Sequence, residues 1–458
     1  MSQNNIGEFI QQSRKAKGFT QKDLGDRIGV SDKTISKWEN GNSIPDTSIL
    51  NELCATLDIN VNELLSGEKL TPEIYSMKAE ENMMNLLEDN QKQQRFALLP
   101  CAAGIILLIL TGLFAIFTHM LLPDMLDIHF HGAVGHDFCQ ASKEELLKIA
   151  EYEAANGVLA ICPATMSYNE EILGKVMDKA ADYNEESGAD LVGINMEGPF
   201  IDLKKAGAQN PEYIMPADKE MFLRLQERSG GLIKLVDIAP EEKGAMDFIE
   251  QCHEQVKISI AHTCCNYETA CEALDKGVSH MTHLYNAMPG INHRNPGPII
   301  AALEAGAEVE LIADGIHIHP AIVRMTFRIF GADKVILISD SMEATGLLDG
   351  DYQLGGQGVT VKGRKAILTK NPDVIAGSVT NLLDCMRNCV QNMGIPLENA
   401  VLAATENPAK SIGVEKDYGK IAVGNYGNLL LLDKELRVIN IVQKGKMIKP
   451  MHQDAGIS

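Results

Sequence analysis

The sequence lacks two features that would assign it to a broad class of protein: paired cysteines and an excess of positive charge. It has 10 cysteines among 458 residues, but none shows the paired spacing of a zinc finger. Cys264-Cys265 and Cys385 with Cys389 are typical of buried or helical thiols, so we expect a reduced, cytoplasmic setting. The formal net charge of -21 argues against a protein that coats nucleic acid or acidic lipid with its whole surface. Any contact with DNA must therefore be local.

Residues 1–66 have the pattern of short helices that begin at capping residues. Thr20 precedes a predicted helix and Ser31 precedes another, with a tight turn between them. The string from Thr20 to Gly41 resembles the helix-turn-helix domains of the Cro and phage-repressor class. By that resemblance, the helix at 31–39 would enter the major groove of DNA.

The resemblance also implies which side chains touch DNA: Lys33, Thr34 and Lys37 would face the groove, and Gln21 would lie near a phosphate. The local charge agrees, because residues 11–37 contain seven Lys or Arg and three Asp. The alternative is that these lysines form an ordinary solvated face.

A long uncharged run follows a polar connector. Residues 67–95 are rich in Glu, Asn and Gln and are predicted to form a helical connector. Residues 96–122 contain no Asp, Glu, Lys or Arg, and these 27 residues would extend about 40 Å as a helix, more than the ~30 Å core of a bilayer. We predict a transmembrane helix at 96–122, with a buried core helix as the alternative.

The flanking charges predict the orientation of this helix. Lys78, Lys92 and Arg95 precede it, whereas no Lys or Arg follows until Lys143. The positive-inside rule therefore predicts a single-pass membrane protein with its amino terminus in the cytoplasm. Three alternatives stay open, because the chemistry predicted below also belongs in the cytoplasm: the segment does not span, the remainder lies outside, or the reading frame joins two unrelated genes after Leu122.

From residue 126 onward, apolar strand-like runs alternate with helical stretches. The runs are 126–131, 157–163, 191–197, 233–239, 256–262, 279–284, 309–313 and 335–340. Eight strand-helix units predict an α/β domain of the (β/α)8 barrel type. We assign 123–345 to its first part and 371–418 to its end, with strands of a partial small β-sandwich at 346–370 and 419–458. The predicted fold class is thus multi-domain: an all-α helix-turn-helix, one transmembrane helix and this barrel.

Several predicted strands end in a residue that can bind a metal or move a proton. His129 and His131 share one face of the first strand. The others are Glu197, His262, His283 and Asp340. Because barrel active sites are built at the carboxyl ends of the strands, we expect these side chains to converge.

Short motifs around these residues carry a family resemblance. They are Met196-Glu197-Gly198-Pro199-Phe200, His283-Leu284-Tyr285-Asn286-Ala287-Met288, Ala313-Asp314-Gly315-Ile316-His317, Ser339-Asp340-Ser341-Met342 and Ala376-Gly377-Ser378. Together they resemble the N-acetylglucosamine-6-phosphate deacetylases of the amidohydrolase superfamily, over about residues 123–448. The resemblance implies hydrolysis of the acetamide of an amino-sugar phosphate.

The resemblance implies one or two divalent metal ions, with zinc or iron the expected choice. Glu197, His262 and His283 would hold one ion and His129 and His131 a second, with Glu197 able to bridge them. Asp340 would take a proton from the attacking water and pass it to the departing amine.

Substrate contacts also follow from the resemblance. Arg294 and His317 would bind the sugar phosphate, since the guanidinium fork of arginine suits phosphate. Arg294 is expected to reach the site of a neighbouring subunit, which implies a homodimer. Further contacts are expected from Gln209, Asn286, Ala287, Ala376, Gly377 and Ser378.

Three departures from the family pattern are visible. Gln209 stands where some members have a histidine that polarises the acetyl carbonyl, and our hypothesis is that the second metal replaces that imidazole. Asp124 stands where glycine is common, so we expect backbone strain there. The first strands of the family's β-sandwich are missing, which is expected to leave strand edges unpaired.

Two functions fit these observations. The favoured one is a metal-dependent N-acetylglucosamine-6-phosphate deacetylase that carries a DNA-binding module. The alternative is a membrane-bound transcription regulator whose barrel senses an amino-sugar phosphate without turnover.

Overall fold

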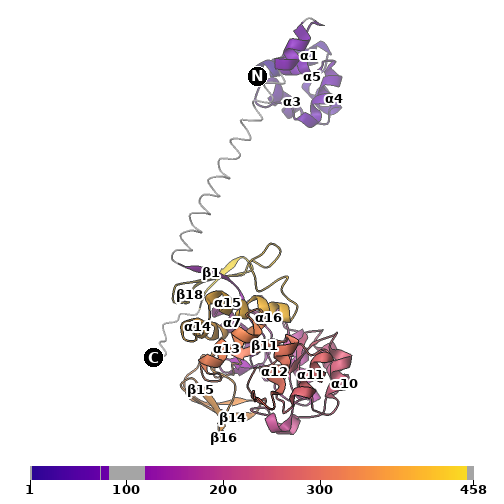
Figure 1. Ribbon diagram of the computed structural model, residues 1–458. Helices are drawn as coiled ribbons and strands as arrows, with labels where there is room; N and C mark the ends of the chain where they lie inside the picture. Colours follow the sequence, from indigo (N-terminus) through magenta and orange to yellow (C-terminus); the bar gives the residue numbers. More distant parts are fainter. Residues whose placement is uncertain (1–2, 73, 82–118, 451–458) are drawn as a thin grey trace. The chain divides into compact units, whose positions relative to one another are not determined.

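The computed structural model describes residues 3–72, 74–81 and 119–450, and the chain divides into two compact units, 1–113 and 114–458 (Figure 1). Each unit is described by itself.

The amino-terminal unit is a bundle of short helices around a small apolar core. Its helices are α1 (Gln3–Ala16), α2 (Gln21–Arg27), α3 (Asp32–Glu39), α4 (Thr47–Leu57) and α5 (Val61–Ser66). The predicted caps are confirmed: the Thr20 side chain accepts from Asp23 N at the start of α2, and Ser31 accepts from Thr34 N at the start of α3. Residues 74–81 of the predicted connector are also helical.

The prediction of a transmembrane protein is wrong. Residues 96–118 lie outside the described residues, and residues 120–122 of the predicted helix belong to a β-strand, β1 (Met120–Pro123). Among the helices that the structure describes, none is long and apolar enough to cross a bilayer. The strand also runs through the proposed gene junction after Leu122, because β1 pairs antiparallel with β17 (Leu429–Leu432) from Met120 to Pro123.

The second unit is built on two curled parallel sheets surrounded by helices (Figure 1). Its main strands are β2 (Met125–Asp127), β5 (Val158–Ile161), β7 (Ile194–Glu197), β8 (Ile233–Ile238), β9 (Lys257–Ile260), β10 (His280–Met281), β11 (Glu308–Ile312) and β12 (Val335–Ile338). Shorter strands are β3 (Gly132–Ala133), β4 (His136–Asp137) and β6 (Asp190–Leu191). Each predicted strand overlaps one of the main strands. These strands are almost wholly buried, because helices cover their outer side.

Helices connect successive strands. They are α7 (Lys143–Ala155), α8 (Glu170–Ala181), α9 (Lys219–Arg228), α10 (Ala245–Cys252), α11 (Tyr267–Asp275), α12 (Gly297–Ala305), α13 (Pro320–Phe330) and α14 (Leu382–Gln391), followed by α15 (Leu397–Ala404) and α16 (Glu406–Ser411). Backbone hydrogen bonds join the first strand's end to the last, since Asp340 N donates to His129 O and His131 N donates to Ser341 O. The parallel strands form two sheets, β2-β5-β6 and β7-β8-β9-β10-β11-β12, and these bonds help to close the two sheets into a barrel-like shape.

Two small antiparallel sheets flank this barrel-like core, at different ends of it (Figure 1). One contains β13 (Gly350–Leu354), β14 (Gln357–Lys362), β15 (Lys365–Leu368) and β16 (Asn371–Ile375). The other has the order β1, β17, β18 (Val438–Gln443) and β19 (Lys446–Ile448). We predicted these segments as one partial sandwich, but alternating strands do not specify which strand pairs with which. We expected unpaired strand edges in these segments, and one edge of β17 is paired with β1.

Asp124 connects β1 to the barrel-like core and is buried. The expected backbone strain is not found, because the φ angle of Asp124 is not positive. Its carboxylate instead accepts hydrogen bonds from Gly419 N and from Asn428 Nδ2, both at 3.2 Å. Aspartate here ties the first strand to the carboxyl-terminal segment.

Candidate metal centre and its pocket

Six side chains from five different strand ends meet in one buried cluster. His129 and His131 follow β2, Glu197 ends β7, and His262, His283 and Asp340 each lie two residues beyond β9, β10 and β12. Their exposed fractions lie between 0% and 8%. The structure therefore brings together all the residues that we predicted as metal ligands, with the predicted proton carrier among them.

Glu197 is the centre of this cluster. Its Oε1 lies 3.0 Å from His262 Nε2, 3.2 Å from His283 Nε2 and 3.7 Å from His129 Nε2. Its Oε2 lies 3.4 Å from His131 Nε2. One carboxylate thus faces two pairs of imidazoles, an arrangement suited to bridging two cations.

Asp340 lies beside the His-x-His pair. Its Oδ1 is 3.3 Å from His131 Nε2 and 4.0 Å from His129 Nε2. The backbone φ angles of His262, His283 and Asp340 are 42°, 28° and 47°. Non-glycine residues adopt this left-handed region at a cost of order 1–3 kcal/mol each, and such strain concentrates at functional sites.

The electrostatics of the cluster favour a carboxylate at Glu197. Burial alone would raise its pKa, but the neighbouring His129, His262 and His283 hold it well below its ordinary value. Burial likewise opposes ionisation of Asp340, but its bond to His131 and the nearby imidazoles keep its pKa low. Burial lowers the pKa of His131, whereas Asp340 and Glu197 together raise it to about 9. The ionisation of each carboxylate and imidazole in the cluster therefore depends strongly on its neighbours.

The donor set fits a divalent cation. Ligand atoms of His129, Glu197 and His283 lie within 4.8 Å of one another, and so do those of His129, His131 and Asp340. His129 Nε2 is buried and has no hydrogen-bond partner among the residues that the structure describes. His262 Nδ1 lies 2.7 Å from Lys205 O, so it is placed to donate there and to leave Nε2 as a ligand. Buried imidazoles and carboxylates that converge in this way are the donors that zinc and iron take.

A pocket of about 390 Å³ opens beside the cluster. Several of the predicted substrate residues line it, namely Gln209, Asn286, Ala287, His317 and Gly377. His317 Nδ1 lies 2.8 Å from Asp314 Oδ2, and although burial lowers its pKa, the Asp314 carboxylate outweighs that effect and raises it. The Asp314 carboxylate thus favours the protonated imidazole of His317, which is the form that suits an anionic ligand.

Gln209 is engaged by its neighbours. Its Nε2 donates to Glu197 Oε2 at 2.7 Å, and its Oε1 accepts from Ser167 N at 2.6 Å. The residue therefore orients the central carboxylate. Asn286 Nδ2 donates to the carbonyl oxygens of His283 and Leu284.

Three residues that we predicted to contact the substrate, Ala376, Ser378 and Arg294, do not line the pocket. Ala376 and Ser378 are buried, and Ser378 Oγ donates to Ser339 O at 2.6 Å, so it anchors the loop that carries Asp340. Arg294 is exposed and does not line the pocket of its own chain.

Sequence reasoning missed several residues of the site. Lys204 and Lys205 line the pocket, as do Leu354 at the end of β13 and residues 373–375 within β16. Glu310 lies within β11 and contacts His129. A carboxylate inside the otherwise apolar run Val309 to Ile312 was the available signal for this residue.

In the amino-terminal unit, α3 presents the predicted DNA-binding face. Lys33 and Lys37 are exposed four residues apart, and Ile35 and Trp38 are buried on the opposite side. Thr34 Oγ1 lies 2.9 Å from Ser31 Oγ. Gln21 Nε2 donates to Glu39 Oε2 at 2.8 Å, and Glu39 forms a buried ion pair with Arg14.

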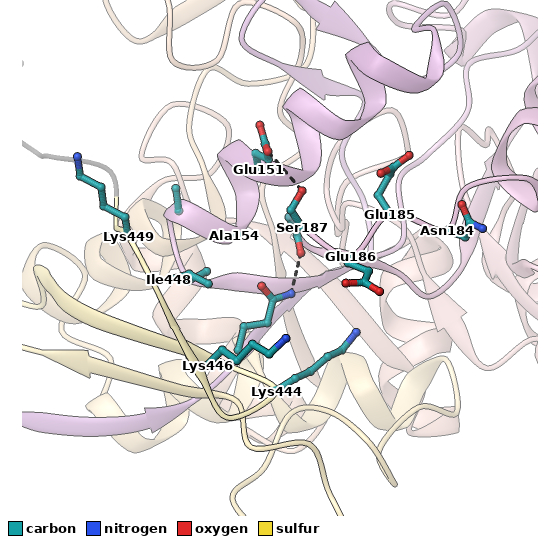
Figure 2. A pocket seen from close by; sticks show the side chains of 13 residues that line it. Glu151, Ala154, Asn184, Glu185, Glu186, Ser187, Lys444, Lys446, Ile448 and Lys449 are labelled. Atoms are coloured by element: carbon teal, nitrogen blue, oxygen red, sulfur yellow. Dashed lines mark hydrogen bonds between the residues drawn. The ribbon is translucent and has the colours of Figure 1, made fainter.

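A second hollow of about 730 Å³ lies in the carboxyl-terminal unit and contains none of the metal-cluster residues (Figure 2). Glu151 and Ser187 form one wall, while Lys444 and Lys446 from the β18–β19 hairpin form the other. Ser187 Oγ donates to Glu151 Oε1 at 3.5 Å.

Family comparison places these features in known classes. The profile of the amidohydrolase family matches residues 120–452, and a helix-turn-helix profile matches residues 10–64. The chain belongs to the amidohydrolase family and carries a helix-turn-helix domain ahead of it.

Similar proteins within the amidohydrolase family are deacetylases of amino-sugar phosphates. N-acetylglucosamine-6-phosphate deacetylase of Bacillus subtilis (strain 168) is 38% identical over 335 residues, which cover 72% of this chain and 84% of that protein. N-acetylgalactosamine-6-phosphate deacetylase of Escherichia coli O157:H7 is 30% identical over 332 residues, covering 72% and 87%. The solved N-acetyl-D-glucosamine-6-phosphate deacetylase from Mycobacterium smegmatis has a TM-score of 0.69 at 31% identity, covering 72% of this chain and 88% of that one.

Proposed function

We propose that this protein hydrolyses the acetamide of an N-acetylated amino-sugar 6-phosphate, N-acetylglucosamine 6-phosphate above all, to the free amine and acetate. The observation that carries the proposal is Asp340, buried against His131 within the cluster centred on Glu197. The names of the relatives supply the substrate class.

The proposed reaction assigns one task to each group. A divalent cation, zinc or iron, would supply Lewis acidity, which makes water a better nucleophile and the acetamide carbon a better electrophile. Glu197, His262 and His283 would hold one such ion, and His129 with His131 a second. Asp340 accepts a proton from the water as the water oxygen adds to the carbonyl carbon. It then returns the proton to the amide nitrogen as the C–N bond breaks.

Several groups would bind the sugar phosphate. His317, whose imidazole pKa is raised by the Asp314 carboxylate, lines the pocket together with Lys204 and Lys205. Arg294 is exposed on its own chain and would complete the site of a second copy in a homodimer. Gln209 stands in the position of the carbonyl-polarising histidine, and we propose that the second ion takes over that task.

The amino-terminal unit would bind DNA through Lys33, Thr34 and Lys37, with Gln21 near a phosphate. Exposure of both lysines on one face of α3 supports this role. The alternative for the whole chain is a regulator in which the barrel senses the amino-sugar phosphate without hydrolysing it.

The test is acetate release by the purified full chain, supplied with zinc or iron(II). The two substrates compared are N-acetylglucosamine 6-phosphate and N-acetylgalactosamine 6-phosphate. We expect faster release from the glucosamine derivative. Failure of the wild-type chain to release acetate from either sugar, together with a change of DNA affinity when the sugar binds, would favour the regulator.

A further inference from the structure

Glu310 is a buried carboxylate that joins the two halves of the candidate metal centre. It lies in β11 and has an exposed fraction of 0%. Its Oε2 is 3.0 Å from His129 Nδ1, and the same oxygen accepts the backbone N–H of His283 at 3.0 Å. One atom therefore contacts a predicted ligand of the second ion and the backbone of a predicted ligand of the first.

The contact with His129 decides which nitrogen of that imidazole can bind a cation. A neutral imidazole has one N–H and one lone pair, so a proton on Nδ1 leaves Nε2 as the ligand. Nε2 is the nitrogen that faces Glu197 and Asp340, and within the described part of the chain it has no hydrogen-bond partner. Donation from Nδ1 to Glu310 is the tautomer that a metal ligand needs.

A second neighbour competes for the same nitrogen. The amide nitrogen of Asn195 lies 3.3 Å from His129 Nδ1 and also donates to Ile128 O. If Asn195 donated to Nδ1, the proton of His129 would move to Nε2 and block metal binding. Glu310 Oε2 opposes this arrangement, because it already accepts the backbone N–H of His283 and is therefore placed to accept from His129 Nδ1 as well.

We propose that Glu310 is a positioning residue, which fixes the orientation and tautomer of His129 and so allows the protein to hold a second divalent cation. This inference rests on the proposed metal-dependent function. It assigns Glu310 no contact with substrate. Loss of the Glu310 side chain is expected to weaken mainly the binding of the second ion. Glu310 Oε2 contacts the imidazole of His129, whereas it contacts His283 through the backbone N–H.

The experiment measures metal binding by the full chain. Apo-protein is titrated with cobalt(II), with the bound metal counted by elemental analysis and followed by its visible absorption. We expect two equivalents for the wild type. In Glu310→Leu the second equivalent should bind about 10- to 100-fold more weakly, with a much smaller change in the first. Glu310→Gln, which keeps the shape and one acceptor, should give an intermediate loss and decides the matter if the leucine variant does not fold.

Glu153→Leu is the matched control, because Glu153 is equally buried but neither of its carboxylate oxygens forms a hydrogen bond with any described residue. It should bind two equivalents as the wild type does. The proposal is overturned if the second equivalent binds the Glu310 variants as tightly as the wild type, if both equivalents weaken equally, or if the wild type binds one ion only. Acetate release by the wild type is measured separately. A chain that binds two ions and loses the second in Glu310→Leu, but releases no acetate, would refute the deacetylase and leave the role of Glu310 intact.

Discussion

The backbone N–H of Asp340 donates to the carbonyl oxygen of His129 at 2.9 Å. This bond joins the end of the last barrel strand to the end of the first, and it places the proposed proton carrier beside a proposed metal ligand. Asp127 reinforces the junction, because its buried carboxylate accepts from His129 N at 3.2 Å and from Ser339 N at 3.3 Å. The chemistry of the site therefore depends on closure of the barrel-like sheet.

Asp340→Asn should abolish acetate release while leaving metal bound. The amide nearly matches the carboxylate in size but cannot carry the proton, so we expect kcat to fall by about 10²- to 10⁴-fold. Steady-state kinetics and metal analysis on the same sample check this. Unchanged turnover would remove Asp340 from the reaction, and loss of metal would make it a ligand instead.

Metal removal should cost both activity and stability. A cation that binds the folded chain alone stabilises it by mass action, so dialysis against a chelator should lower the thermal midpoint as well as the rate. Zinc or iron(II) should restore both. His262→Ala should reproduce the loss, because His262 Nε2 lies 3.0 Å from the central carboxylate. A chelated sample of full activity would contradict the proposed role of the metal.

The sequence predicted the ligand cluster because each ligand follows a local strand signal. In a parallel barrel the carboxyl ends of all strands meet at one rim, so residues far apart in the chain converge without any knowledge of side-chain contacts. His129, Glu197 and Asp340 are examples. Whether each is a ligand or a proton carrier is still a prediction.

Other features depended on contacts that no local pattern contains. Residues 120–122 are apolar because they form a strand against β17, and composition alone does not separate such a strand from the end of a membrane helix. Ser378 looked like a substrate contact, but its hydroxyl donates to a backbone carbonyl. The role of Glu310 depends on a partner, His129, in a different strand of the barrel.

Asp124→Asn should flatten the dependence of stability on pH between about 4 and 6. Burial raises the pKa of Asp124 to about 6, from an ordinary value of 3.8, despite hydrogen bonds from Asn428 and Gly419. Between these values the folded chain holds a proton that the unfolded chain releases, so stability falls as pH rises, by about 3 kcal/mol over the window.

The asparagine variant has no proton to release and should lose this part of the slope. Thermal midpoints in buffers across the window measure it. Asp275→Asn, at an exposed position at the end of α11, is the control and should keep the wild-type slope. An Asp124→Asn curve parallel to that of the wild type would show that the carboxylate is not perturbed.

Replacement of Lys33 and Lys37 by alanine should weaken DNA binding and reduce its dependence on salt. Each lysine that neutralises a phosphate contributes about 0.9 to the slope of log K against log salt. The double variant should therefore lose up to about two units of slope on a mixed-sequence duplex. Lys69→Ala, beyond the end of α5, is the control for an exposed lysine outside α3. Equal slopes for the wild type, the double variant and Lys69→Ala would show that Lys33 and Lys37 form an ordinary solvated face.

Mixing two inactive variants should restore activity if Arg294 serves the site of a second copy. Asp340→Asn lacks the proton carrier, and Arg294→Ala lacks the exposed cation that does not line its own chain's pocket. In a mixed dimer, one of the two sites would combine the intact Asp340 of one chain with the intact Arg294 of the other. We expect the mixture, after exchange of subunits, to release acetate faster than either variant alone, with a KM close to that of the wild type. If Arg294 acted within its own chain, each mixed site would still lack one of the two groups and no activity would return. Sedimentation of the wild-type chain as a monomer under assay conditions would exclude the shared site altogether.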